Sequence, residues 1–136
     1  DQLRMIRSLS KTDGVIKAVQ MDLPFPVSVN TYYRHYNNRM VISARGRKFR
    51  QEVEQRILAS KEGLPVPLFG DSDVGLSMVL HPPDKRKRDI DNFSGKSVLD
   101  SLIGGLYLDD SQVRTLHVEF GEIVKGGKLD LICTRI

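Results

Sequence analysis

The sequence predicts an α/β domain of the α+β type, in which a mixed β-sheet of about four or five strands packs with two main helices. Three observations predict this fold. Several segments alternate apolar and polar residues, two segments carry apolar residues every three or four positions, and glycine or proline residues separate them. The 136 residues, 40% hydrophobic and 28% charged, suffice for one core and are too polar for a membrane protein. We therefore expect residues 15–136 to form a single domain.

Residues 1–14 leave several structures open. Leu3, Met5, Ile6 and Leu9 could form a short amphipathic turn, which the segment 11–14 would break. An N-terminal extension, a cloning remnant, an ordered arm and a disordered tail all fit this pattern. Because residue 1 is Asp rather than Met, we expect that the sequence does not begin at a native start.

A strand followed by a polar loop is predicted next. Val15–Met21 alternates weakly, and Pro24 and Pro26 then end any ladder pairing. The predicted loop, residues 27–36, carries Asn30, Tyr33 and Arg34. Aromatic and cationic side chains on a loop could stack on bases and touch phosphates, but tyrosines that cover the edge of the core with hydrated hydroxyls fit equally well.

The first main helix is predicted from Ser43 to about Lys61. Ser43 is a typical N-cap residue, and Phe49, Val53 and Ile57 recur every four positions on one helical face. A proline-containing loop follows this helix. Residues 74–80 then alternate as expected for a strand with one buried face, which ends at Pro82 and Pro83.

A second helix and a hairpin complete the predicted fold. The helix is expected over residues 93–103, where apolar residues share a face, and it should end at Gly104 and Gly105. Residues 115–120 and 129–133 alternate as strands. The Lys-Gly-Gly-Lys segment 125–128 lies between them and predicts a hairpin turn.

Cysteine usage and hydropathy indicate the compartment. Cys133 is the only cysteine and lies in an apolar segment, so we expect a buried residue without a disulfide partner. Apolar segments are far shorter than the roughly 20 residues that span a bilayer, and the beginning does not resemble a signal peptide. We expect a reducing, cytoplasmic setting and no membrane partner.

Positive charge is concentrated in two segments, although the net charge is only +4. From Leu23 to Gln51 there is no acidic residue, and this span contains Arg34, Arg39, Arg45, Arg47, Lys48 and Arg50. The second cluster is Lys85, Arg86, Lys87 and Arg88. Such clusters are typical of a surface that binds a phosphate backbone, although a single cluster would fit a solvated surface as well.

Three aspartates suggest a divalent metal. If residues 88–91 are extended, Asp89 and Asp91 point to one side while Ile90 points into the core. Asp110 could approach this pair if the chain turns back after the second helix. Three carboxylates suit Mg²⁺ or Mn²⁺, whereas the three histidines lack the spacing of a zinc site. Each aspartate also has a structural alternative, because Asp91 or Asn92 could cap the next helix and Asp109-Asp110 could form a polar turn.

The sequence resembles the RusA family of Holliday junction resolvases from about Val15 to Thr134. The resemblance rests on the order and spacing of six motifs, namely Leu23-Pro24-Phe25-Pro26, Asn30-Thr31-Tyr32-Tyr33-Arg34-His35, Val41-Ile42-Ser43, the basic segment ending in Asp89-Ile90-Asp91-Asn92, Leu108-Asp109-Asp110-Ser111-Gln112-Val113 and Lys125-Gly126-Gly127-Lys128-Leu129. It implies a homodimeric, Mg²⁺-dependent endonuclease without a nucleotide cofactor, which acts in DNA recombination and repair in a prokaryotic cell or a phage-infected host. Its substrate would be a four-way DNA junction, nicked symmetrically on two strands.

The resemblance also implies roles for individual residues. The acidic site falls on Asp89, Asp91 and Asp110, which would bind the metal, and the essential lysine falls on Lys96. DNA contacts would come from the second basic cluster, above all Arg88. Lys96 departs from the family pattern because it follows Asp91 by five residues instead of four. A shift of one residue rotates a helical side chain by about 100°, so either a local bulge at Gly95 restores its direction or Lys96 misses the site.

Two other functions fit the residues. A DNA-binding module without catalysis would use the aspartates as caps and turns, and it would bind DNA regardless of Mg²⁺. A metal-dependent nuclease for flaps or other branched DNA would use the same carboxylates on a different substrate.

Overall fold

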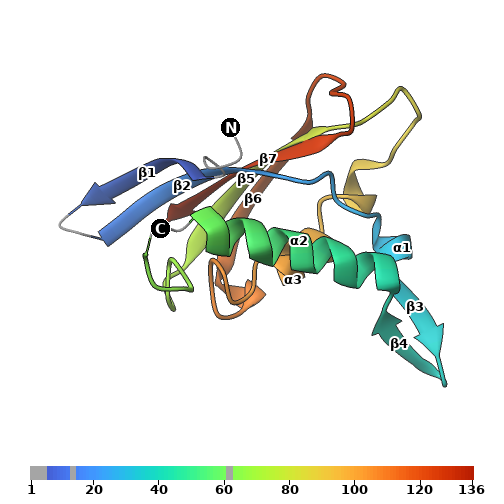
Figure 1. The fold of residues 1–136 in the computed structure, drawn as a ribbon, viewed down its shortest axis with the longest axis horizontal. Helices are drawn as coiled ribbons and strands as arrows, with labels where there is room; N and C mark the ends of the chain where they lie inside the picture. The colour runs from blue at the N-terminus through green and yellow to red at the C-terminus, as the bar shows by residue number, and fades with distance from the viewer. Residues whose placement is uncertain (1–5, 13–14, 61–62) are drawn as a thin grey trace.

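A five-stranded mixed β-sheet forms the body of the molecule (Figure 1). The computed structural model describes residues 6–12, 15–60 and 63–136. The strand order is β1-β2-β7-β5-β6, and only β5 and β6 are parallel. These strands are β1 (Ile6–Thr12), β2 (Val15–Leu23), β5 (Val74–His81), β6 (Val113–Phe120) and β7 (Lys128–Arg135). The mixed sheet predicted from the sequence is confirmed, and the segment 6–12 adds a strand to it.

The remaining elements are short, with one exception. The long helix is α2 (Ala44–Ser60), and the others are α1 (Val29–Tyr32), β3 (Tyr33–Tyr36), β4 (Arg39–Ile42), the 3₁₀ turn η1 (Ile90–Asn92), α3 (Lys96–Ser101) and the 3₁₀ turn η2 (Asp110–Gln112). No helix in the described ranges is long and apolar enough to span a membrane.

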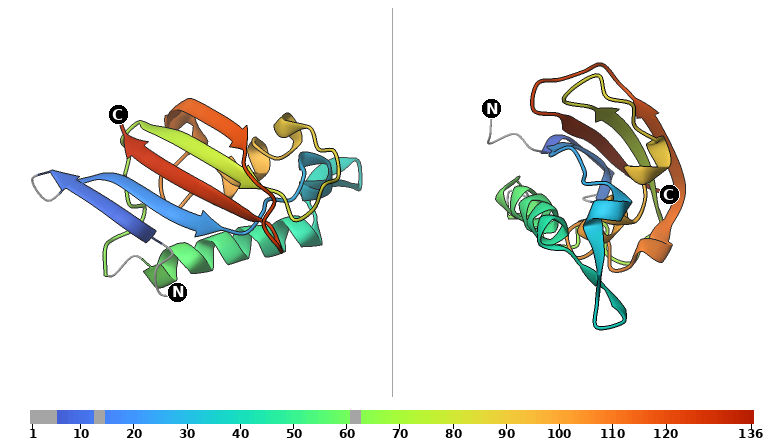
Figure 2. Two further views of the ribbon diagram at one scale, coloured as in Figure 1. Left: turned by 90° about the horizontal axis from the view of Figure 1, so that it is seen from above. Right: turned by 90° about the vertical axis from the view of Figure 1, so that its right-hand side faces the viewer.

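Helix α2 covers one face of the sheet and forms the core with it (Figure 2). Phe49, Val53 and Ile57 are 4%, 1% and 1% exposed, as the spacing predicted. The Ser43 hydroxyl accepts a hydrogen bond from the Gly46 amide at 3.0 Å, so the predicted N-cap is confirmed. Cys133 is fully buried, also as predicted, and this burial raises the pKa of its thiol to about 12.

Leu131 provides a test of this core. It is fully buried on the central strand β7, opposite Met21 on β2 and Met78 on β5. We expect Leu131→Ala to lower the free energy of unfolding by about 2–5 kcal/mol, because it removes buried methyl groups and leaves a cavity. Urea denaturation measures the change. The matched control is Ile132→Ala, since Ile132 is 40% exposed on the same strand. Equal losses in the two variants would contradict this arrangement of the core.

The predicted hairpin at residues 125–128 is wrong, because β5 lies between β6 and β7. The chain does turn there, and the Gly127 amide donates to the Val124 carbonyl at 2.7 Å. However, the segment between β6 and β7 crosses the end of β5, where the Gly121 amide donates to Leu80 and the Val124 amide to Pro82. Alternation predicts the strands but not which strand lies beside which.

The predicted strand at residues 115–120 is confirmed as β6, which is exposed over most of its length. Leu116 is 44% and Phe120 38% exposed. Strand β6 is the edge strand of the sheet and pairs with β5 alone.

The predicted loop 27–36 is instead helix α1 followed by the first strand of a second, two-stranded sheet. Strands β3 and β4 pair from Tyr33–Ile42 to Tyr36–Arg39. Asn37 and Asn38 form the turn with φ of 49° and 59°, a backbone region that Asn tolerates better than most residues. This hairpin projects from the body of the molecule beyond the N-terminal end of α2 (Figure 1).

The second helix is shorter than predicted. Only Lys96–Ser101 is α-helical, and the segment before it contains the separate turn η1. Gly95 has non-helical dihedral angles (φ −106°, ψ −126°), and Gly104 has a φ of 91°. These two glycines interrupt the helix on either side, although the apolar spacing continues through both.

Candidate active site

The four predicted catalytic residues lie in one connection of the chain, residues 82–112, which joins β5 to β6. Because these strands are parallel, the connection must return from the end of β5 to the beginning of β6. Asp89 precedes η1, Asp91 lies within it, and Lys96 begins α3. Asp110 begins η2, directly before β6. Turn η1 also contacts β6, so the connection folds back on itself.

Lys96 contacts Asp110, one of the three predicted metal ligands, despite its shift in register. Its Nζ lies 2.7 Å from Asp110 Oδ2 and 3.2 Å from Asp100 Oδ1. Helix α3 begins only at Lys96, so the extra residue is accommodated at the non-helical Gly95. The hydrogen bond to Asp110, followed by that to Asp100, raises the pKa of Lys96, and its ammonium therefore stays charged at neutral pH.

Asp100 is part of this site and was not among the predicted residues. Its side chain is 17% exposed and accepts a hydrogen bond from the Tyr33 hydroxyl at 3.1 Å. Burial raises the pKa of Tyr33 to about 12, and the charge of Asp100 adds to this shift.

The signal that could have found Asp100 is its position four residues after Lys96 on the predicted helix.

Asp109 and Asp110 have different surroundings although they are adjacent. Asp109 caps η2, where its carboxylate accepts from the Ser111 amide at 3.0 Å. Hydrogen bonds from the Ser111 side chain and from this amide lower the pKa of Asp109. The side chain of Gln112 accepts in return from the Asp109 amide at 3.0 Å. The predicted polar turn is therefore made by Asp109, which leaves the carboxylate of Asp110 to Lys96.

Asp89 and Asp91 are exposed, but they do not flank a buried residue as predicted. Ile90 is 39% exposed, because Ile90–Asn92 forms a 3₁₀ turn instead of continuing a strand. The alternative that Asp91 or Asn92 caps the next helix is wrong. Among the described residues the N-cap of α3 is Gly95, without a hydrogen bond from a capping side chain.

Carboxylates are suitable ligands for a hard cation, but in this structure the predicted ones are not arranged around a common point. Within residues 6–12, 15–60 and 63–136, no group of three or more His, Cys, Asp or Glu side chains is arranged to hold a metal ion. Asp110 instead contacts the ammonium of Lys96. A cation on Asp110 would therefore have to take the place of this ammonium.

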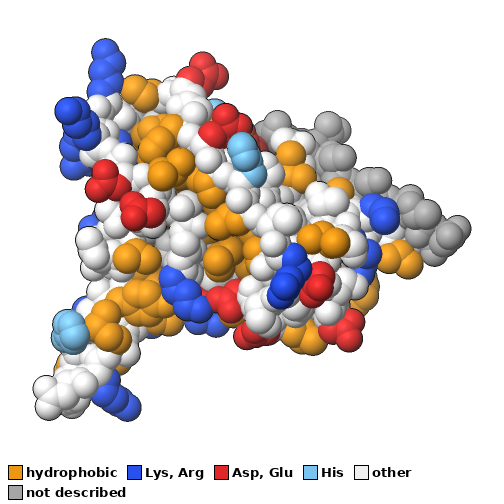
Figure 3. All heavy atoms as spheres, turned by 180° about the vertical axis from the view of Figure 1, so that it is seen from behind, with side chains coloured by type: hydrophobic (Ala, Val, Ile, Leu, Met, Phe, Trp, Pro, Cys, Tyr) orange, Lys and Arg blue, Asp and Glu red, His pale blue; other side chains and the backbone are white. Residues whose placement is uncertain are grey.

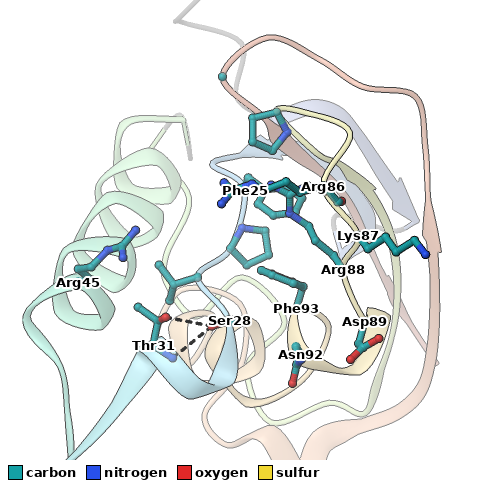
Figure 4. A pocket seen from close by; sticks show the side chains of 14 residues that line it. Phe25, Ser28, Thr31, Arg45, Arg86, Lys87, Arg88, Asp89, Asn92 and Phe93 are labelled. Atoms are coloured by element: carbon teal, nitrogen blue, oxygen red, sulfur yellow. Dashed lines mark hydrogen bonds between the residues drawn. The ribbon is translucent and has the colours of Figure 1, made fainter.

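A basic groove of about 730 Å³ lies beside Asp89 (Figure 4). Its cationic side chains come from both predicted clusters, because α2 contributes Arg45 and the connection contributes Arg86, Lys87 and Arg88. The space-filling view shows Lys and Arg side chains gathered at one end of the molecule with acidic side chains next to them (Figure 3). The groove thus combines cationic walls with a carboxylate, as a nuclease of DNA requires.

The cationic residues of the groove differ in freedom. The side chain of Arg88 is 11% exposed, lies 3.0 Å from Asp84 and stacks over the ring of Phe25. Hydrogen bonds from Arg86 and Arg88 lower the pKa of Asp84 to about 2. Arg86 has an 80% exposed side chain, and Lys85 and Lys87 are exposed as well. Arg88 and Arg86 therefore both pair with Asp84, Arg88 within the groove wall and Arg86 at the surface, while Lys85 and Lys87 are exposed where they could contact phosphates.

The other predicted DNA-binding residues do not line this groove. Asn30 is exposed on α1, and Arg34 is exposed on the β3–β4 hairpin, where its guanidinium lies 5.2 Å from the centre of the Tyr36 ring. Tyr33 is only partly exposed, and its hydroxyl donates a hydrogen bond to Asp100.

A family model described as Endodeoxyribonuclease RusA matches residues 24–129. The chain belongs to the RusA family. This finding confirms the resemblance read from the sequence and makes the chain an endodeoxyribonuclease by family. RusA nucleases are generally metal-dependent, which agrees in kind with a site built of carboxylates.

Curated relatives of this RusA chain match along most of their length. The crossover junction endodeoxyribonuclease rusA of Enterobacteria phage HK97 is 37% identical over 118 residues, which cover 86% of this chain and 94% of the relative. That of Enterobacteria phage 82 is 39% identical over 117 residues, or 84% of this chain and 92% of the relative. The RusA enzyme of Escherichia coli strain K12 is 38% identical over 117 residues, which cover 84% of this chain and 92% of the relative.

Proposed function

We propose that this protein is a Mg²⁺-dependent resolvase, which cuts four-way DNA junctions by paired, symmetric nicks during recombination and repair. The observation that carries the proposal is the basic groove with Asp89 in its wall, in a chain of the RusA family. The relatives named above are crossover junction endodeoxyribonucleases of phages and of Escherichia coli. We propose the cytoplasm of a prokaryotic or phage-infected cell as its place of action.

In this proposal Asp89, Asp91 and Asp110 bind the cation, with Mn²⁺ as a possible substitute. Carboxylate oxygens are the ligands that Mg²⁺ prefers in proteins, and such a site keeps positions open for water and phosphate oxygens. When bound, the cation supplies charge stabilisation and a more acidic water for attack on the phosphodiester. Lys96, whose ammonium contacts Asp110 in this structure, would give up that contact to the cation and stay beside the site, where it would neutralise charge that develops on the phosphate oxygens.

DNA would lie along the basic groove and reach the β3–β4 hairpin. Lys85, Arg86 and Lys87 are exposed beside the groove, whereas Arg88 is part of the groove wall and is held there by its ion pair with Asp84. Asn30 and Arg34 extend this surface toward the hairpin. Two symmetric nicks require two active sites, so we propose a homodimer whose two-fold axis places one site at each of two opposed strands.

A substrate panel tests the proposed function. We expect a synthetic four-way junction in Mg²⁺ to be cut at paired, symmetric sites, and a flap and a linear duplex of the same sequence to be cut far less. Gel analysis of end-labelled strands measures both rate and position. Preferential cutting of the flap would favour a nuclease for other branches, and binding without nicking in any metal would favour a non-catalytic DNA-binding module.

Salt provides an independent test of the groove. Because lysine and arginine contacts release counterions from DNA, each phosphate contact adds about one unit to the slope of log affinity against log salt. We expect Lys87→Ala to lower this slope by about one unit, measured by junction binding in Ca²⁺ or without metal. Lys17→Ala is the control, since Lys17 is exposed on β2, outside the groove lining. An unchanged slope for Lys87→Ala would contradict the proposed path of DNA.

A further inference from the structure

The ammonium of Lys96 lies between two carboxylates that belong to different parts of the connection. Asp110 begins η2 and accepts at 2.7 Å, a short distance for a charged hydrogen bond. Asp100 lies one turn after Lys96 on α3 and accepts at 3.2 Å. One of these two aspartates is a proposed metal ligand, and the other has no role in the function described so far.

We propose that Asp100 is a positioning residue that receives the ammonium of Lys96 when a divalent cation binds Asp110. The proposal rests on the proposed function, in which Asp110 is a metal ligand. Asp100 itself binds neither the cation nor DNA. It acts only through Lys96, by holding the ammonium close to the reacting phosphate and away from the cation.

The proposal follows from competition for one carboxylate. Asp110 Oδ2 contacts Nζ directly, and a Mg²⁺ ion would need to lie about 2.0–2.1 Å from its ligand oxygen. Two cations at these distances repel each other, so the ammonium has to withdraw as the metal binds. Without a second acceptor, the withdrawn ammonium would be left unpaired beside the metal. Asp100 offers that acceptor without backbone motion, because it already contacts the same Nζ.

The surroundings of Asp100 suit a fixed acceptor. Its side chain is 17% exposed, less than that of Asp110 at 23% and far less than that of Lys96 at 51%. The Tyr33 hydroxyl donates to Asp100 Oδ2 at 3.1 Å and leaves Oδ1 to Lys96. The Tyr33 ring packs edge-on against Tyr32, which is fully buried, with ring centres 4.9 Å apart. The carboxylate is thus held in place while the lysine beside it can move.

The same contact joins the DNA-binding surface to the active site. Tyr33 is the first residue of β3, so the hydrogen bond to Asp100 ties the base of the projecting hairpin to α3. A continuous chain of contacts runs from Tyr33 through Asp100 and Lys96 to Asp110. DNA bound at the hairpin would therefore lie at one end of a chain whose other end is the metal site.

Cation affinity without DNA tests the proposal, with free Mn²⁺ measured by its EPR signal and Mg²⁺ as competitor. We expect Asp100→Asn to weaken binding about tenfold, because the displaced ammonium loses its acceptor. Tyr33→Phe should weaken binding less, in the same direction. Asp71→Asn, which removes an exposed carboxylate away from the site, should leave the affinity unchanged. Thermal unfolding and junction binding of each variant show whether it is folded.

A double-mutant cycle separates action through Lys96 from direct coordination. In a Lys96→Met background the ammonium is absent, so Asp100→Asn should change cation affinity less than twofold. A tenfold loss in that background would overturn the proposal, because it would make Asp100 a metal ligand. An unchanged affinity of Asp100→Asn in the native background would overturn it as well. A native protein that binds no cation and cuts no junction would contradict the proposed function and this inference together, whereas normal cutting with an unaffected Asp100→Asn contradicts the inference alone.

Discussion

Asp91→Asn is expected to lower Mg²⁺-dependent cleavage of a four-way junction by at least about a hundredfold while junction binding persists. A carboxamide replaces a charged oxygen ligand with a neutral one, and a bound cation contributes several kcal/mol of transition-state stabilisation, where each 1.4 kcal/mol is tenfold in rate. Asp91 is exposed on η1 and does not cap α3, so its replacement should leave the fold intact. Single-turnover cleavage and gel-shift binding measure the two effects separately.

The control for this variant is Asp71→Asn, which removes one exposed negative charge from the loop before β5. It should cut the junction at the native rate. Full cleavage by Asp91→Asn would remove Asp91 from the metal site. Loss of junction binding together with cleavage would instead indicate that Asp91 orders the basic groove.

Lys96→Met is expected to lower the single-turnover rate by about 10²–10³, with junction binding little changed. This is the usual loss when one positioned charged donor is removed from a developing anion. Methionine keeps the apolar length of the side chain and removes only the ammonium, which lies beside the proposed metal ligand Asp110. The rate is measured with saturating enzyme and excess Mg²⁺, so that any change in cation affinity does not contribute.

Lys48→Met is the matched control for this lysine. Lys48 is an exposed residue of α2 outside the contacts of the active site, and its replacement should affect the salt dependence of binding at most. Cleavage by Lys96→Met at the native rate would show that the role expected for the lysine belongs to another residue.

The elements that could be predicted from the sequence are those whose pattern is complete within one segment. Ser43 begins α2, and the spacing of Phe49, Val53 and Ile57 identifies its buried face. Alternation likewise predicted β5. The position of β5 between β6 and β7 was not predictable in this way. The alternation of residues within a strand does not show which other strand it pairs with.

The β3–β4 hairpin was missed for a different reason. Its strands are only four residues long, and its turn is Asn37-Asn38, a weaker turn signal than Asn-Gly. The second helix was expected to end at Gly104, but its beginning was placed too early, because Phe93 fits the apolar spacing although the backbone is not helical at Gly95. The conformation of Gly95 therefore decides where this helix begins.

The sequence proposed the residues of the candidate site but did not show which of them are in contact. The pairing of Lys96 with Asp110 was left open by the shift in register, and the structure shows that the start of α3 decides it. The position of Asp100 four residues after Lys96 could have shown that pair, but the contact of Asp100 with the Tyr33 hydroxyl could not be predicted, because Tyr33 is distant in sequence. A contact between residues so far apart cannot be read from spacing within one helix.

The connection between β5 and β6 has a consequence for how such enzymes diversify. Every proposed catalytic side chain lies in this one stretch, whereas the strands on both sides pair through their own backbones. Point changes within the stretch can therefore silence or retune the chemistry without altering the order of the strands. The projecting hairpin, encoded elsewhere, would be inherited unchanged. A lineage could in this way turn a cutting enzyme into a junction-binding protein through very few substitutions.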